Sequence, residues 1–362
     1  MRANSEPLRV GMVGCGRVSS KYIEAIRASD RLILAACTDL MMANARAVAD
    51  AHGVDVADSL EALLQDDSVD VVLNLTPPHA HEAVTISALE AGKHVYSEKP
   101  LATTREAARR VMQAAASSNC LLACAPDQIL TGAMREAREM IDAGRIGNPI
   151  AVTAFMMNRG HEQWHPDPAG YYAFPGGGPF YNRAGYYVGA LINLFGPVAE
   201  VSAMGRITWP NREIKTGSKA GNLIPVEVPT HISANLAFEN GVIATVVMSF
   251  DVWNTSLPRI EIYGSEATVV LPDPVTNIGK ALFLPQHESE AQNIPLRQSQ
   301  DIGTGIRDLA SAIDNNRQPI LDAGLAYHIV DIIESVHVSI TQGSTQQIES
   351  SCLRPELGVV TP

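Results

Sequence analysis

A lysine fixed by a proline, directly after a short apolar run, is the feature of this sequence best suited to proton transfer. Residues 94–97 lead into Glu98, Lys99 and Pro100. Pro100 restricts the backbone of Lys99 to an extended conformation, so the ammonium group is held in one direction. Burial would lower the pKa of this lysine towards working pH. We therefore expect Lys99 to act as a general acid or base in a cleft.

A glycine-rich turn near the N-terminus has the residue types that bind a pyrophosphate. The run Gly14-Cys15-Gly16-Arg17-Val18-Ser19 follows an apolar run and precedes a helical pattern. Gly14 would allow the tight turn, Gly16 would let the backbone approach the phosphates, and Ser19 would permit close helix–strand packing. The free N–H groups of the helix would face the phosphates. The turn, with Arg17 and Val18, is expected to bind a dinucleotide because both the strand and the helix are present.

Asp39 stands where a dinucleotide-binding protein needs a carboxylate. It ends the second apolar run, and the residues that follow, Leu40, Met41 and Met42, include no Arg or Lys. A carboxylate at this place accepts hydrogen bonds from the adenosine ribose and repels a 2′-phosphate. We therefore expect NAD as the cofactor rather than NADP. The alternative interpretation makes Asp39 a turn residue without a ligand.

Strands and helices that alternate over the first 125 residues are expected to position these side chains. We expect strands at 8–13, 32–38, 69–75, 94–97 and 121–124. A helix should run from about 80 to 91, and Thr103 with Glu106 predicts a capping box at the start of the next helix. Nearly all-apolar strands that alternate with helices indicate a parallel sheet covered on both faces.

The pattern changes after about residue 125. Helices are expected at about 131–143, 305–315 and 323–341, and strands at 150–157, 200–207, 231–238, 241–249, 259–263 and 267–271. Asn240-Gly241 joins two of these strands, and this pair is the strongest short signal for a hairpin. Segments 209–229 and 272–300 are polar and are expected to be long loops. The second part is therefore expected to hold a mainly antiparallel or mixed sheet.

Composition narrows the class of protein. The chain has 362 residues, which favours two domains. Its formal net charge is −12, without a Lys/Arg-rich block, so nucleic-acid binding and attraction to anionic lipid are not expected. The apolar runs are too short for a membrane helix. Five scattered cysteines favour a reducing, cytoplasmic location.

Segment 158–187 is dense in polar and aromatic side chains, which suit a hydroxyl-rich ring. Trp164 and His165 are the substrate-binding candidates here, against the alternative of a surface loop. His161 and His165 are four residues apart, a spacing that could hold a metal on a helix. Pro166 and Pro168 argue against a helix at this place, so no metal is expected.

Taken together, several motifs of the chain resemble the glucose-fructose oxidoreductase / inositol dehydrogenase (Gfo/Idh/MocA) family. They are Gly11-Met12-Val13-Gly14-Cys15-Gly16, Thr76-Pro77-Pro78-His79-Ala80-His81, Ala91-Gly92-Lys93-His94-Val95-Tyr96-Ser97-Glu98-Lys99-Pro100-Leu101, and Gly176-Gly177-Gly178-Pro179 continuing to Pro197. The resemblance covers nearly the whole chain. It implies an α/β protein with a Rossmann domain (1–125) and a C-terminal α+β domain (126–362) that carries a large open, mostly antiparallel sheet.

The resemblance also implies an activity, an assembly and residue roles. The usual chemistry is reversible oxidation of a secondary alcohol on a sugar, glycoside or cyclitol, in homodimers or homotetramers built through the C-terminal sheet. Thr76, Pro77 and His81 would lie along the adenosine and ribose side of the cofactor. Glu98 and Lys99 would lie at the nicotinamide ribose, and Lys99 would also reach the substrate hydroxyl.

This sequence departs from the family where many members carry an Asp and a His, four residues apart. Here those places hold Asn182 and Tyr186. Neither an Asn nor a Tyr of ordinary pKa, about 10, is an efficient base near neutrality. In one interpretation Lys99 works alone or with His165, and Asn182 and Tyr186 orient hydroxyls. In a second, Lys99 lowers the pKa of Tyr186 and the two act as a pair. In a third, the protein binds the cofactor but has lost most of its turnover.

Three functions remain open at this point. The first is an NAD-dependent sugar or polyol dehydrogenase. The second is an enzyme whose bound NAD oxidises a sugar transiently to permit elimination or glycoside cleavage. The third is a non-catalytic cofactor-binding homologue.

Overall fold

The computed structural model describes residues 6–130, 132–172, 176–287, 290–295 and 302–356. Contacts between Cα atoms divide the chain into two compact units. The first unit, the nucleotide-binding unit, contains residues up to 127 together with the segment Asp301–Val330 and the C-terminal end. The second, the sheet unit, contains Gln128–Gln300 and Asp331–Arg354.

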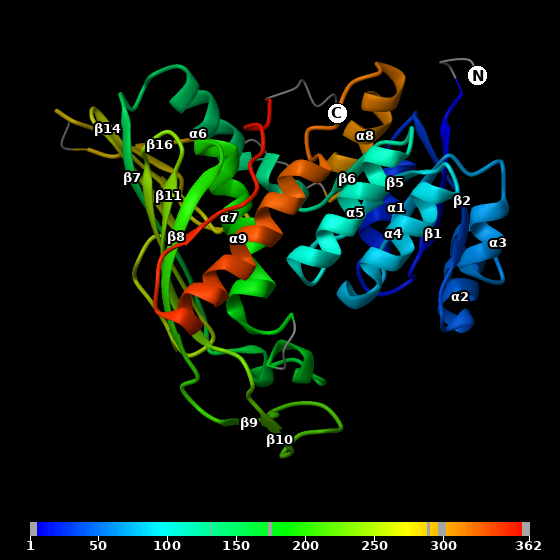
Figure 1. Ribbon diagram of the computed structural model, residues 1–362, viewed down its shortest axis with the longest axis horizontal. Coiled ribbons are helices and arrows are strands. Elements are labelled where there is room, and N and C mark those ends of the chain that lie inside the picture. Colours follow the sequence, from blue (N-terminus) through cyan, green and yellow to red (C-terminus); the bar gives the residue numbers. More distant parts are fainter. Residues whose placement is uncertain (1–5, 131, 173–175, 288–289, 296–301, 357–362) are drawn as a thin grey trace. The chain divides into compact units, whose positions relative to one another are not determined.

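The nucleotide-binding unit is built on a six-stranded parallel sheet of order β3-β2-β1-β4-β5-β6 (Figure 1). Its strands are β1 Leu8–Val13, β2 Leu32–Thr38, β3 Asp55–Val56, β4 Val71–Asn74, β5 His94–Ser97 and β6 Leu122–Cys124. Its helices are α1 Ser19–Arg27, α2 Met42–His52, α3 Leu60–Gln65, α4 His81–Glu90, α5 Arg105–Ser117 and α8 Thr304–Asp314. The expected parallel sheet is confirmed; the two-residue β3 and the helices α2 and α3 were not predicted.

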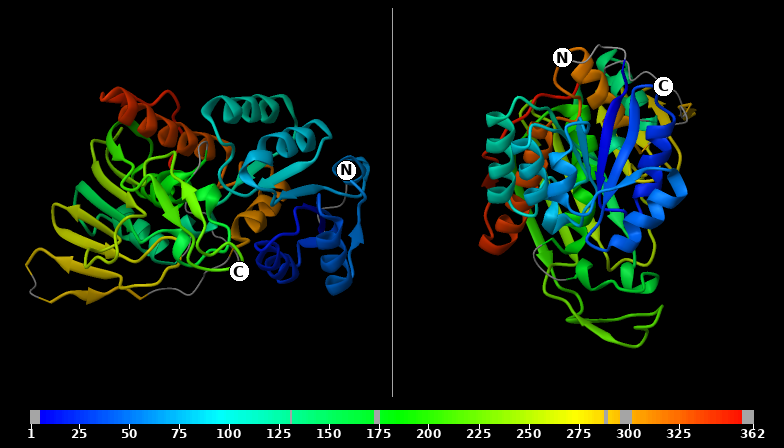
Figure 2. Two further views of the ribbon diagram at one scale, coloured as in Figure 1. Left: turned by 90° about the horizontal axis from the view of Figure 1, so that it is seen from below. Right: turned by 90° about the vertical axis from the view of Figure 1, so that its right-hand side faces the viewer.

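Two apolar clusters cover the two faces of this sheet. On one face, side chains of α1, α2 and α8 pack on β1 and β2, with Tyr22, Ile26 and Leu309 fully buried. On the other, side chains of α3, α4 and α5 and the start of α9 (Ala323–Gln342) pack around Val72 and Val95. The left view of Figure 2 shows α4 and α5 on the side of the sheet opposite to α1 and α8. Coverage on both faces explains why the strands are apolar throughout.

The sheet unit has a nine-stranded, mostly antiparallel sheet of order β16-β15-β14-β13-β7-β12-β11-β8-β17, in which only β7 and β12 pair in parallel among the pairs that the structure describes. Its strands are β7 Pro149–Met157, β8 Val198–Arg206, β11 His231–Phe238, β12 Ile243–Ser249, β13 Ile260–Gly264, β14 Ala267–Leu271, β15 Leu282–Pro285, β16 Gln292–Asn293 and β17 Gln346–Gln347. The predicted Asn-Gly hairpin between β11 and β12 is confirmed. Helices α6 Gly132–Asp142 and α7 Gly178–Phe195 belong to this unit, and α7 packs on β7, β11 and β12.

Three local predictions need correction. Segment 209–229 is not a long loop throughout, because β9 Asn211–Glu213 and β10 Leu223–Pro225 pair as a small antiparallel sheet. Segment 272–300 likewise contains β15 and β16. The cap of α5 is Thr104, whose hydroxyl accepts a hydrogen bond from Ala107 N at 3.1 Å, and not Thr103. The predicted helix start at Thr131 lies outside the described residues.

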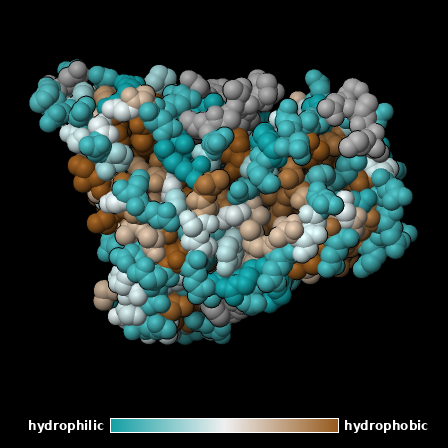
Figure 3. All heavy atoms as spheres, turned by 45° about the horizontal axis from the view of Figure 1, so that its top comes forward, coloured by the Kyte–Doolittle hydropathy of each residue, from teal (hydrophilic) through white to brown (hydrophobic). Residues whose placement is uncertain are grey.

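The surface carries both hydrophilic and hydrophobic side chains. Figure 3 shows hydrophilic residues over much of one face, with hydrophobic residues gathered between them. Among the described residues, no helix is long and apolar enough to cross a membrane.

Candidate active site

Three neighbouring strands of the nucleotide-binding unit end at the same level. Val13 of β1 is in register with Asn74 of β4, and Asn74 is in register with Ser97 of β5. The residues that follow these strands therefore lie together at the carboxyl edge of the sheet. They are the glycine turn, the segment from Leu75 to Pro77, and the pair Glu98 and Lys99. Ligands of open parallel sheets collect at this edge.

The two glycines of the turn serve different purposes. Gly14 has a φ of +97°, and a Cβ there would come within 2.8 Å of the backbone of Leu75. The turn therefore needs glycine at this position for its own fold. Gly16 has no atom within 4 Å of a Cβ position, so the space above its backbone is open to an approaching phosphate. Ser19 closes the turn by donating from its hydroxyl to Gly16 O at 2.7 Å.

Asp39 is fixed beside this turn. Its Oδ2 accepts from Cys15 N at 2.7 Å, and its Oδ1 accepts from Met41 N at 2.7 Å. The carboxylate is therefore oriented before a ligand arrives, and each oxygen keeps capacity for a further hydrogen bond. Arg17 is exposed and Val18 is partly buried at the start of α1. This arrangement fits an adenosine ribose and pyrophosphate.

The carboxylate of Glu98 is held by groups that sequence reasoning missed. Oε1 accepts from Tyr22 Oη on α1 at 2.9 Å, and Oε2 accepts from Lys99 N at 3.0 Å. Burial raises the pKa of Tyr22, so its hydroxyl stays protonated and keeps donating. Because Tyr22 lies 76 positions before Glu98 in the chain, no local pattern could link the two. Glu98 and Lys99 are both partly exposed.

His81 is buried in the protein and contacts its backbone. It is 1% exposed, and its two ring nitrogens lie 2.6 Å from Pro100 O and 2.7 Å from Thr76 O. Burial lowers the pKa of His81, so a neutral ring donates to one of these carbonyls. The hydroxyl of Thr76 donates to Asn74 Oδ1 at 2.6 Å, while Pro77 is exposed. His81 thus connects the segment after β4 with the Glu98–Pro100 segment.

The other predicted site residues belong to the sheet unit. Asn182 and Tyr186 are four residues apart on α7, so they share one face of the helix, and both are partly buried. Tyr187, next to them, is fully buried, and burial raises its pKa.

Trp164 and His165 lie in an aromatic group between β7 and α7. The ring of His161 stacks on Tyr171 with centroids 3.7 Å apart, and Trp164 lies 5.3 Å from His161. Trp164 is 53% exposed, whereas the Nδ1 of His165 accepts from Asp167 N at 3.1 Å. The short helix Ala169–Tyr171 in this group packs against α7. Within the described residues, no three His, Cys, Asp or Glu side chains form a group that could hold a metal.

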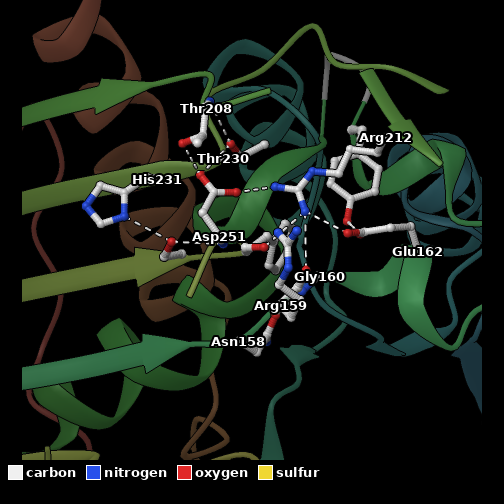
Figure 4. Close-up of polar contacts among 12 residues, drawn as sticks. Asn158, Arg159, Gly160, Glu162, Thr208, Arg212, Thr230, His231 and Asp251 are labelled. Atoms are coloured by element: carbon white, nitrogen blue, oxygen red, sulfur yellow. Dashed lines mark hydrogen bonds and ion pairs between the residues drawn. The ribbon is translucent and has the colours of Figure 1, made fainter. Parts of the chain in front are cut away.

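A buried charged cluster adjoins the aromatic group, and sequence reasoning missed it (Figure 4). Arg212 of β9 donates from Nη1 to Glu162 Oε1 at 2.8 Å and from Nη2 to Asp251 Oδ1. Tyr172 donates to the other oxygen of Glu162, and Thr208 and Thr230 donate to the other oxygen of Asp251. Burial acts to raise the pKa of Glu162, but the hydrogen bonds from Tyr172 and Arg212 outweigh it and lower the pKa. Arg212 lies in a polar segment whose composition indicates a loop, so no local pattern in the sequence predicts this cluster.

Comparisons with protein families agree with this geometry. Residues 8–125 match the model of the Gfo/Idh/MocA oxidoreductase family, NAD-binding Rossmann fold. Residues 134–270 match the model of the Gfo/Idh/MocA C-terminal domain.

Individual relatives match either one part or the whole chain. An uncharacterized oxidoreductase of Schizosaccharomyces pombe is 30% identical over 40% of this chain, and the match spans 39% of the relative. The 1,5-anhydro-D-fructose reductase of Ensifer adhaerens is 36% identical over 41% of this chain and 44% of its own length. The D-glucoside 3-dehydrogenase of Escherichia coli K12 is 26% identical over 95% of this chain and 98% of its own length.

The fold recurs in solved structures. Levoglucosan dehydrogenase in complex with NADH and L-sorbose superposes with a TM-score of 0.82 at 19% identity, over 95% of this chain and 100% of that one. At 19% identity, the similarity shows that the two proteins share a fold.

Proposed function

The chain belongs to the Gfo/Idh/MocA family of NAD-binding oxidoreductases, and on this basis we propose that it is a sugar or polyol dehydrogenase with Lys99 as its acid/base. The hydride would pass between a secondary alcohol carbon of a sugar, glycoside or cyclitol and the nicotinamide. The main support for the proposal is that the strands β1, β4 and β5 end at the same position along the sheet. That register brings the glycine turn and Lys99 to one edge of the sheet.

The residues present fit the dinucleotide. Gly16 leaves open space for a pyrophosphate, and the oriented carboxylate of Asp39 suits two ribose hydroxyls. When bound, the nicotinamide accepts or returns the hydride. Glu98, fixed by Tyr22, orients the backbone that carries Lys99. Lys99 takes the hydroxyl proton in oxidation and gives it back in reduction.

The candidate substrate-binding residues of the sheet unit have the chemistry to bind a sugar. Asn182 and Tyr186 offer neutral donors and acceptors from one face of α7, and Trp164 offers an exposed aromatic surface for the ring. His165 keeps Nε2 for a ligand because its Nδ1 is engaged by the backbone.

The proposal is tested by replacing Lys99. In Lys99→Ala, kcat on an active sugar should fall by about 10² to 10⁴, the usual contribution of positioned acid/base catalysis. The Kd for NAD should stay within a few-fold of that of the parent chain. Lys21→Ala, at an exposed position of α1, is the matched control and should keep both values. Full turnover in Lys99→Ala would remove Lys99 from the proton-transfer step.

A further inference from the structure

The guanidinium of Arg159 lies between two indole rings and pairs with no carboxylate among the described residues. Its guanidinium carbon lies 4.3 Å from the ring centroid of Trp209 and 4.3 Å from that of Trp253. Its Nε and Nη1 are buried and have no hydrogen-bond acceptor among the described residues. Buried donors without acceptors are costly, and they persist where a ligand or ordered water completes them.

The nearby carboxylates do not accept hydrogen bonds from Arg159, because their oxygens already accept from other side chains. Glu162 and Asp251 both bind Arg212, and their remaining oxygens accept from Tyr172, Thr208 and Thr230. The main chain of Arg159 also takes part, since its carbonyl accepts from Arg212 Nη1 at 3.2 Å. Arg212 therefore fixes the backbone of Arg159, while no carboxylate of the described part of the chain pairs with the Arg159 side chain (Figure 4).

The two indoles that flank Arg159 differ in exposure. Trp209 is 37% exposed and Trp253 is 74% exposed. Most of the Trp253 side chain is therefore accessible to a ligand. Indole faces also pack against the C–H surface of a sugar ring. The three side chains thus combine one positive charge, two unused donors and an apolar platform.

We infer that Arg159, Trp209 and Trp253 form a binding site for the carboxylate of a sugar acid, an aldonate or a uronate. A single guanidinium matches one carboxylate in charge and donors. The inference rests on the proposed function, because it names the substrate class of that enzyme.

The fluorescence of the protein provides a direct test. All three tryptophans of the chain, Trp164, Trp209 and Trp253, lie in the sheet unit. The full-length protein is titrated with D-gluconate, D-galactonate, D-glucuronate and D-galacturonate at constant ionic strength, and calorimetry is run in parallel. D-glucose and methyl D-glucoside serve as the neutral probes. At least one acid should bind saturably, and at least tenfold more tightly than either neutral sugar.

Variants distinguish this site from any other. Arg159→Gln should weaken binding of the acid at least tenfold and leave the neutral sugars unchanged, whereas Arg159→Lys should keep part of the affinity. Arg27→Gln, which removes one exposed positive charge in the nucleotide-binding unit, should change nothing. If Arg159→Gln does not fold, Trp253→Ala tests the same site and should weaken acid binding.

Three results would overturn the inference: no binding of any acid, equal affinity for acids and neutral sugars, or undiminished acid binding in Arg159→Gln. Failure of the proposed function has a different signature. The protein would then bind no NAD while still binding a sugar acid through Arg159.

Discussion

At the scale of single residues, Arg212 connects three segments that are distant in sequence. Its partners Glu162 and Asp251 are 50 and 39 positions away. The side chains of all three are nearly inaccessible, with exposures of 2% for Arg212, 3% for Glu162 and 7% for Asp251. Removing the cation would leave two carboxylates buried without a counter-charge.

Arg212→Met should therefore lower the free energy of unfolding by about 3–5 kcal/mol, the usual cost of breaking a buried ion pair. Urea unfolding followed by tryptophan emission would measure this, since all three tryptophans report on the sheet unit. Arg135→Met is the matched control, because its pair with Glu139 is partly exposed and should contribute under about 1 kcal/mol. Equal losses in the two variants would mean that the cluster does not stabilise the unit.

The sequence could reveal site residues only where their role depends on local spacing. Gly14, Gly16, Asp39 and Lys99 belong to motifs whose strand and helix are adjacent in the chain, so their positions at the sheet edge could be predicted. Tyr22, Arg159 and Arg212 act through partners that only the tertiary fold brings near. No local motif in the sequence distinguishes these three residues from other Tyr and Arg residues.

At the scale of elements, Asp127 fixes the start of α8 to the end of β6. Its carboxylate accepts from Gly303 N at 2.6 Å and from Gly305 N at 2.9 Å, and Tyr96 donates to it as well. Burial, with a smaller contribution from Glu98, raises the pKa of Asp127 to about 6 despite these hydrogen bonds. Because this pKa is raised on folding, Asp127 contributes stability below about pH 4. That contribution is lost as pH rises through 6.

The stability difference between the parent chain and Asp127→Asn should therefore depend on pH. Between pH 4 and pH 7.5 the parent should lose about 2.4 kcal/mol relative to the variant, at about 1.4 kcal/mol per unit of pKa, because part of the difference is already lost at pH 4. Urea unfolding followed by circular dichroism at both pH values is the measurement, since the nucleotide-binding unit contains no tryptophan. A difference that stays constant with pH would show that Asp127 does not titrate in this range.

Elements with strong periodicity could be predicted, and short ones could not. The β11 and β14 boundaries match the predicted ranges because alternating burial is clear in both strands. The strands β9, β10 and β16 have two or three residues each. Such strands bury little apolar surface, and they form because they pair with a neighbouring strand. Their polar sequences lack the alternating pattern that would predict a strand.

At the scale of the whole molecule, the nine-stranded sheet has one face that the unit itself does not fully cover. Val247 of β12 and its register partner Phe155 of β7 are only partly buried, and Ile243 is 55% exposed. We propose that this face joins copies of the chain into a dimer or tetramer.

Light scattering coupled to gel filtration would test the assembly. The parent chain should elute as a dimer or tetramer, and Val247→Asp should shift it towards the monomer by placing a charge on the contact face. Asn240→Asp adds the same charge at the β11–β12 turn, where the oxygen that accepts from Val242 N is retained, and should leave the mass unchanged. A monomeric parent chain would disprove the assembly.

The most direct test of the account is calorimetric titration of the protein with NAD and NADH, in the parent chain and in Gly16→Ala. The open space at Gly16 means that the variant should fold like the parent. Its methyl group would meet the pyrophosphate, so affinity should fall at least tenfold, which is about 1.4 kcal/mol. We expect one saturable site per parent chain and this loss in the variant. Absence of binding in the parent chain, or equal affinity in both proteins, would contradict the assignment of the turn as a dinucleotide site.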